Sequence, residues 1–187
     1  MMNNIKTIAL TVMSLAMFAS CNQKQAKETP APKVQTQAVH PECLLGDSIT
    51  KLVQNGVVEF SAQEGTKFSL IDKMFANVRF PEVGINYYRG QYDKVRNVCY
   101  GATINVKDVN ARYIQIKAYM VDRYGEPTKE TRYYSDDGVA KFTEALWNKG
   151  FFAIALSTTE PLQEENGSVI IVFTISEDIP AFSVYFK

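Results

Sequence analysis

Few residues of this chain have the chemistry for catalysis or metal binding. The sequence holds one histidine, His40, and three cysteines, Cys21, Cys43 and Cys99. A Ser-His-Asp or Cys-His arrangement needs an imidazole held in place, and His40 lies in a polar, proline-containing segment. A zinc cluster of cysteines and histidines is excluded for the same reason. We therefore predict no catalytic residue, no metal site and no cofactor.

Paired acids leave one further route to catalysis. A glycosidase needs only two carboxyl groups, and adjacent acids occur at Asp136-Asp137 and at Glu164-Glu165. Both pairs lie in segments typical of turns. The sequence contains no phosphate-binding glycine loop and no nucleophile elbow. A carboxylate-based hydrolase stays open as the weakest hypothesis, and we predict that the protein is not an enzyme.

Tyrosines gather around a predicted turn at Arg89-Gly90. Tyr87, Tyr88 and Tyr92 could supply rigid contact area with polar tips, and Arg89 could pair with a carboxylate or stack on a ring. Tyrosine is also a favoured strand residue, so a purely structural role stays open. The hypothesis is that Tyr87, Tyr88, Arg89 and Tyr92 form a binding patch for a protein, peptide or glycan. It requires at least two of the three rings to be exposed together.

The first 21 residues have the pattern of an export signal. Lys6 precedes an apolar run over residues 8–18, and the small Ala19 and Ser20 stand directly before Cys21. The run is shorter than the roughly 20 residues that span a bilayer, which favours a cleaved signal peptide over residues 1–20. This pattern resembles the lipobox of bacterial lipoproteins, with Phe18 where that family has leucine. An ordinary signal peptide with an incidental cysteine is the alternative.

The resemblance implies that Cys21 becomes the first residue of the mature chain and carries lipid. Stable anchoring takes at least two acyl chains, and a lipoprotein cysteine carries two or three. The protein would then stay on a membrane of the cell envelope without crossing it. With Cys21 acylated, Cys43 and Cys99 are the remaining thiols, and an exported compartment permits a disulfide between them. We predict that bond; two separate buried thiols are the alternative.

Residues 21–41 are predicted to be a disordered tether that follows the lipidated cysteine. They are rich in Gln, Lys, Ala, Thr and Pro and lack the apolar residues that would compensate the entropy of ordering. No acidic run follows Cys21, which favours a periplasm-facing anchor over the cell surface. Removal of residues 1–20 takes away one basic residue, Lys6, so 19 basic and 20 acidic residues remain. This balance gives no general attraction to nucleic acid.

A single globular domain is predicted for residues 42–187. Its principal helix is expected over about 106–124, because apolar residues recur there at helical spacing. Asn105 or Asp108 can cap its start, and Gly125 with Pro127 ends it. The apolar stripe consists of Val109, Tyr113, Ile116, Met120 and Tyr124. Ile116 and Met120 are expected on the sheet face that includes Ile154 or Val172.

The rest of the domain favours strands. A short N-terminal helix is predicted between Asp47 and Gly56. Residues 140–147 also fit a short helix, but the tight turn at residues 148–150 favours a strand. In the longest strand Val95 and Cys99 are expected on one face and Val98 and Tyr100 on the other. The predicted strands are 57–60, 67–71, 75–80, 85–88, 91–106, 131–134, 140–147, 151–157, 167–176 and 182–186. The predicted fold is therefore α+β, a mainly antiparallel sheet with one principal helix.

Two further motifs carry a second resemblance. The helix ending RYGEP and the segment ALWNKGFFAIALS followed by VIIVF resemble small secreted α+β proteins of gut Bacteroidetes. The resemblance covers about residues 91–176 and implies no activity. We predict a membrane-anchored envelope lipoprotein whose domain binds a ligand without catalysis. An accessory subunit that stabilises an envelope complex is the alternative, and the sequence does not predict an oligomeric state.

Overall fold

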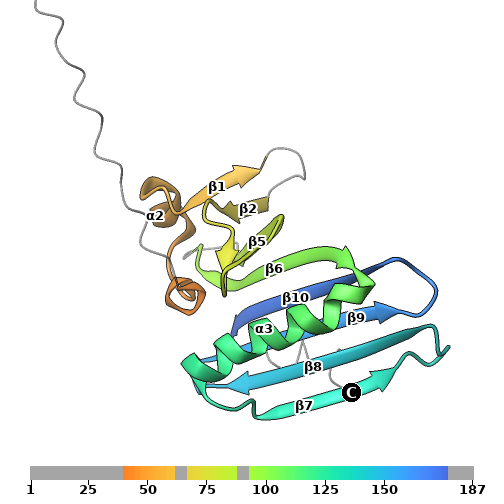
Figure 1. The fold of residues 1–187 in the computed structure, drawn as a ribbon. Coiled ribbons are helices and arrows are strands. Elements are labelled where there is room, and N and C mark those ends of the chain that lie inside the picture. The colour runs from red at the N-terminus through yellow and green to blue at the C-terminus, as the bar shows by residue number, and fades with distance from the viewer. Residues whose placement is uncertain (1–39, 62–66, 88–92, 177–187) are drawn as a thin grey trace, which may run out of the picture. The chain divides into compact units, whose positions relative to one another are not determined.

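The computed structural model describes residues 40–61, 67–87 and 93–176. These residues form an antiparallel sheet with one long helix and two short ones, so the α+β prediction is confirmed in its main features (Figure 1). In chain order the elements are η1 (Pro41–Leu44), α2 (Ile49–Gln54), β1 (Val58–Ser61), β2 (Lys67–Leu70), β3 (Met74–Phe75), β4 (Val78–Arg79), β5 (Glu82–Tyr87), β6 (Val95–Asn105), α3 (Val106–Tyr124), β7 (Lys129–Tyr134), β8 (Ala140–Asn148), β9 (Phe152–Pro161) and β10 (Asn166–Ile175).

The described strands pair into one large sheet in the order β1-β2-β5-β6-β10-β9-β8-β7, and every pair in it is antiparallel. Strand β10 therefore lies inside the sheet between β6 and β9. A single helix, α3, separates β6 from β7 in sequence, which lets β7, β8, β9 and β10 follow as successive hairpins. The segment 140–147 is a strand, as predicted.

Helix α3 begins and ends where the sequence predicts. The Asn105 side chain accepts a hydrogen bond from the backbone N–H of Lys107 at 3.0 Å, and Gly125 follows the last turn with φ +76°. The helix packs on β9, β10 and β6 (Figure 1). Its sheet-facing stripe, Val109, Tyr113, Ile116 and Met120, is buried.

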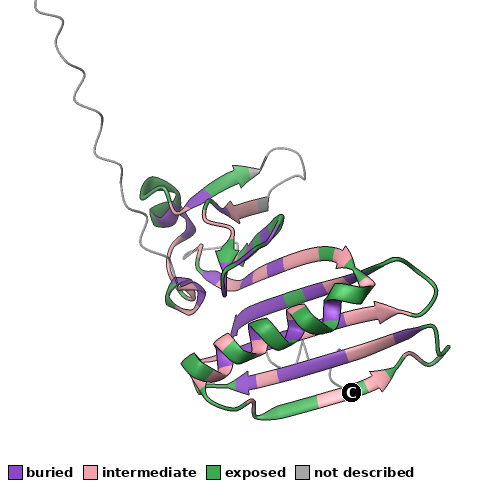
Figure 2. Cartoon of the chain, in the orientation of Figure 1, coloured by how far each residue is buried: buried purple, intermediate pink, exposed green. Residues whose placement is uncertain are grey.

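The core lies between α3 and one face of the sheet, where the strands present large apolar side chains (Figure 2). Ile116 and Met120 share this core with Ile154, as expected. The alternative expectation for Val172 was wrong. In β10 side chains alternate, so Ile171 and Phe173 face the helix while Val172 faces the other side.

Helix α3 approaches the sheet closely at Gly167. A Cβ atom at this position would lie 2.4 Å from the carbonyl oxygen of Thr159 and 2.7 Å from Cγ2 of Val109. Only glycine fits between the first turns of the helix and the neighbouring strand. The position therefore fixes how the helix begins its path across the sheet.

An aromatic cluster closes the core beside β6. The rings of Phe80, Phe75 and Phe173 surround Tyr100 with centroid distances of 5.4, 5.4 and 6.4 Å. Phe75 reaches this cluster because residues 75–80 do not form the single strand that was predicted. Ala76 and Asn77 adopt left-handed backbone conformations with φ of 50° and 59°, and the chain turns into the hairpin of β3 and β4.

Strand β6 contains an irregularity that the alternation rule missed. Tyr87 pairs with Val95 and Asn86 pairs with Asn97, so Arg96 is an extra residue in β6. Val95 is consequently buried in the same core as Val98 and Tyr100, and the prediction that it shares a face with Cys99 was wrong. Cys99 lies on the face opposite α3.

The N-terminal elements η1 and α2 join the same core through Leu44, Ile49 and Leu52. Arg123 near the end of α3 pairs with Glu42 of η1, Nη2 to Oε1, at 2.6 Å. No helix within the described residues is long and apolar enough to cross a membrane. The predicted strand 182–186 lies outside the described part of the chain.

Candidate functional site

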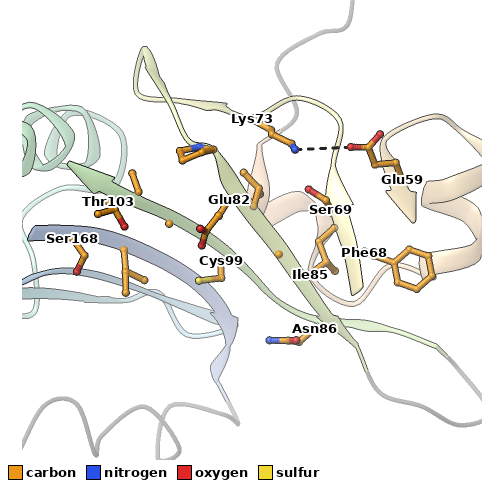
Figure 3. A pocket seen from close by; sticks show the side chains of 16 residues that line it. Glu59, Phe68, Ser69, Lys73, Glu82, Ile85, Asn86, Cys99, Thr103 and Ser168 are labelled. Atoms are coloured by element: carbon orange, nitrogen blue, oxygen red, sulfur yellow. Dashed lines mark ion pairs between the residues drawn. The ribbon is translucent and has the colours of Figure 1, made fainter. Parts of the chain in front are cut away.

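A hollow of about 420 Å³ opens on the sheet face opposite α3, over β2, β5, β6 and the first half of β10 (Figure 3). The residues around it are mixed: charged and hydroxyl side chains alternate with glycines and with apolar side chains such as Phe68, Ile85 and Ile170. They come from strands far apart in sequence, which the antiparallel pairing brings side by side. The residues used below are Ser69, Glu82, Cys99, Thr103, Ser168 and Ile170.

Two glycines create the depth of this hollow. Gly84 pairs with Cys99, and Gly101 pairs with both Glu82 and Ile170. A Cβ atom on Gly84 would meet no atom within 4 Å, and one on Gly101 would meet only the Glu82 side chain, at 3.6 Å. Glycine within a strand often marks a place where a ligand or another backbone approaches closely.

Charge in the hollow is net negative. Glu59 and Lys73 form a long ion pair of 4.0 Å between Oε1 and Nζ on one wall. Glu82 is exposed, and it makes no hydrogen bond or ion pair to any other described residue. Figure 3 shows its carboxylate beside the Cys99 thiol. Burial, together with the charge of Glu82, raises the pKa of Cys99, so this cysteine stays a neutral thiol near neutral pH.

The predicted tyrosine patch is described in part. Tyr87 is half-buried at the end of β5, edge-on to Phe68 at a centroid distance of 5.5 Å. Phe68 in turn contacts Phe60, also at 5.5 Å. Tyr88, Arg89 and Tyr92 lie outside the described residues, so the patch stays a prediction.

The predicted disulfide is absent from the structure, in which Cys43 and Cys99 are both free thiols. Cys43 is exposed on η1, whose neighbours Glu42 and Leu44 join α3 and the core. Cys99 is half-buried on the other face of the sheet. No bond joins the two sulfur atoms, an outcome that residue counting along the chain could not reveal.

The paired acids lie in exposed turns at the same end of the sheet. Asp136-Asp137 joins β7 to β8, Glu164-Glu165 joins β9 to β10, and the N–H of Leu162 donates to Val139 between these turns at 2.8 Å. Asp137 accepts from the backbone N–H of Val139 at 3.2 Å, as a turn residue does. Neither pair lines the hollow. Their geometry gives the hydrolase hypothesis no support.

Sequence reasoning missed one polar cluster, centred on the buried carboxyl group of Glu144. Oε1 of Glu144 accepts from the hydroxyl of Tyr133 at 3.1 Å and lies 3.5 Å from that of Ser157. Oε2 of Glu144 and Oγ1 of Thr131, its paired residue on β7, are buried and have no hydrogen-bond partner within the described ranges. Burial raises the pKa of Glu144. Alternation with the apolar Ala145 and Trp147 was the signal that placed Glu144 on the helix-free face.

No group of three or more His, Cys, Asp or Glu side chains within the described ranges could hold a metal ion. Comparison of the chain with protein-family models, with curated proteins and with solved structures finds no match.

Proposed function

We propose that this protein is a lipid-anchored binding protein of the bacterial cell envelope, and that its ligand binds in the hollow over Gly84 and Gly101. The observation that carries the proposal is the hollow itself, on a face of the sheet that α3 leaves open. Two glycines give it depth, and the carboxylate of Glu82 has no ion-pair partner among the described residues. Its volume of about 420 Å³ lies within the usual range for ligand pockets.

The chemistry around the hollow suits binding better than catalysis. Hydroxyl groups of Ser69, Thr103 and Ser168 can donate to or accept from a polar ligand. Cys99, the strongest potential nucleophile there, has a raised pKa and no histidine beside it. A peptide or a glycan suits a glycine-floored surface that combines hydroxyl groups with apolar side chains.

The membrane anchor is proposed from the lipobox pattern that ends at Cys21. The test is a Cys21→Ala variant expressed in a bacterium that processes lipoproteins and supplied with labelled palmitate. Loss of label, together with release from the membrane fraction or an uncleaved product, supports the anchor. Normal processing and unchanged membrane retention would contradict it.

Binding in the hollow is tested with a variant that fills it. Gly84→Leu adds a side chain where the structure has open space, and Gly84→Ala is the matched control with one added methyl group. The mature protein, extracted in mild detergent, is applied to a peptide library and a glycan array. We expect ligands that the wild type and Gly84→Ala bind and that Gly84→Leu does not. Ligands bound equally by all three proteins would place the binding site elsewhere.

A further inference from the structure

We infer that the hollow selects ligands that carry a primary alkylammonium group, the chemistry of a lysine side chain, and that Glu82 binds that group. The inference rests on the proposed function, because it names the ligand class of the same hollow. It follows from the charge, the shape and the polar groups described above.

Charge gives the first reason. The described residues of the hollow include two carboxylates and one ammonium group, Glu59, Glu82 and Lys73. Lys73 is already paired with Glu59, so Glu82 is the charge without a partner among the described residues. An anionic ligand would meet this carboxylate with repulsion, whereas a cation would complete the pair.

Shape gives the second reason. The Glu82 carboxylate lies over the bare backbone of Gly101, with Oε2 3.6 Å from the position of a Cβ there. Open space at Gly84 continues the hollow along β5. A thin alkyl chain can lie along this floor, because neither glycine projects a side chain into its path. Ile170, 40% exposed beside Gly101, offers apolar contact to the methylene groups.

Hydrogen bonding gives the third reason. An ammonium group has three donors and no acceptor. The carboxylate of Glu82 and the hydroxyls of Thr103 and Ser168 are acceptors on neighbouring strands, and Figure 3 shows them on the same side of β6. An ammonium group is a compact charge whose three donors match one carboxylate and two hydroxyls, whereas a guanidinium group presents a planar fork of five donors.

The test compares matched small probes on the full mature protein by NMR titration. The probes are Nα-acetyl-lysine N-methylamide, the norleucine analogue, which lacks only the amine, and n-butylamine. We expect the lysine probe to bind at least about tenfold more tightly than the norleucine probe, and its binding to weaken as salt is raised. Butylamine distinguishes the ligand's source: equal affinity assigns the hollow to free alkylamines, and weaker affinity assigns it to peptide lysines.

Glu82→Gln keeps the size of the side chain and removes its charge, and Glu165→Gln in an exposed turn is the control. We expect Glu82→Gln to lower affinity for the lysine probe about two- to fivefold, the range of an exposed ion pair, and Glu165→Gln to leave it unchanged. Thermal melting verifies that each variant is folded.

The outcomes separate this inference from the function on which it rests. If Gly84→Leu abolishes library or probe binding while Glu82→Gln changes nothing, the hollow binds a ligand and the ammonium assignment is wrong. If the norleucine probe binds as tightly as the lysine probe, the assignment is wrong as well. If neither Gly84→Leu nor Glu82→Gln affects any binding, both proposals fail.

Discussion

The two faces of the sheet use the same strands for different purposes. On the face toward α3, residues such as Ile154, Ile171 and Phe173 are fully buried in one apolar core. On the opposite face the first half of β10 presents Ser168 and a 40% exposed Ile170 beside the hollow. Neighbouring residues of one strand point to different faces. The same substitution made at two such neighbours therefore tests the core on one face and the hollow on the other.

Two glutamates on neighbouring strands also differ according to the face of the sheet on which they lie. Glu130 of β7 and Glu144 of β8 lie one register position apart and point to opposite faces. Glu130 faces α3, where it accepts from Tyr113 at 2.9 Å and pairs with Lys117 at 2.5 Å. Glu144 is buried on the other side with one oxygen unpartnered. The charged form of Glu130 is therefore stabilised by the ammonium group of Lys117, whereas burial makes the charged form of Glu144 unfavourable.

The largest difference between the faces is expected from Ile171→Ala and Ile170→Ala. Ile171 is fully buried under α3, so its truncation should lower the free energy of unfolding by about 2–5 kcal/mol. Ile170 is the next residue and keeps 40% of its surface exposed, so the same change should cost under about 1 kcal/mol. Urea unfolding of both variants measures this. Equal losses would mean that the two faces are equally covered.

The next comparison uses two strand glycines. Gly167→Ala forces a methyl group against Thr159 and Val109 and should cost about 1–3 kcal/mol. Gly84→Ala meets open space in the hollow, and a loss of unfolded-state entropy should leave it neutral or more stable by up to about 1 kcal/mol. Thermal melting measures both. A destabilised Gly84→Ala protein would show that the hollow is filled in solution.

These contrasts show which part of the fold the sequence could predict. Helix α3 was predictable because its apolar spacing, its Asn105 cap and Gly125 all act locally. The hairpin at Ala76-Asn77 was missed. Asn77 favours a left-handed turn but Ala76 does not, so the apolar residues on both sides read as one strand. The face of Val95 was missed because an extra residue, Arg96, shifts the alternation.

The candidate site was not predictable, since the hollow depends on register. Gly84, Gly101 and Glu82 become neighbours only through the pairing of β5 with β6, and Ile170 joins them from a strand about 70 residues away in sequence. The predicted disulfide was wrong for a related reason. Counting cysteines shows which thiols are left, but only the structure shows that Cys43 lies exposed on η1 and that Cys99 lies half-buried on β6.

A smaller effect should distinguish the two glutamates by pH. Lys117 and Tyr113 lower the pKa of Glu130, so its contribution to stability is present above the ordinary glutamate pKa and is lost as pH falls through the lowered value. Burial raises the pKa of Glu144, so stability is lost as pH rises from the ordinary value through the raised one. Opposite pH slopes of stability are therefore expected from the two residues.

Substitution of each glutamate by glutamine removes its titration and so isolates its contribution to the pH dependence of stability. Glu144→Gln supplies an amide donor in place of the carboxyl group and should be neutral or stabilising at neutral pH, by up to about 1–3 kcal/mol. Glu130→Gln should lose about 0.2–1 kcal/mol at the same pH, as expected for a partly exposed ion pair. Melting temperatures measured from about pH 4 to pH 8 record both. A stabilising effect of Glu144→Gln that persisted unchanged at the acid end would mean that the carboxyl group is ionised when folded.

The smallest expected effect concerns the two thiols, the exposed Cys43 on η1 and the half-buried Cys99 on β6. Both are free in the structure, so titration of the unreduced mature protein with a thiol reagent should give two thiols when Cys21 is acylated, and three when it is not. Cys43 is exposed and should react first. Cys99 should react more slowly, because half-burial restricts access and its raised pKa lowers the thiolate fraction.

A Cys99→Ser variant should remove the slow phase alone, and a bound lysine probe should slow that phase further in the wild type if the ligand occupies the hollow. A count of zero thiols that became two after reduction would instead restore the disulfide.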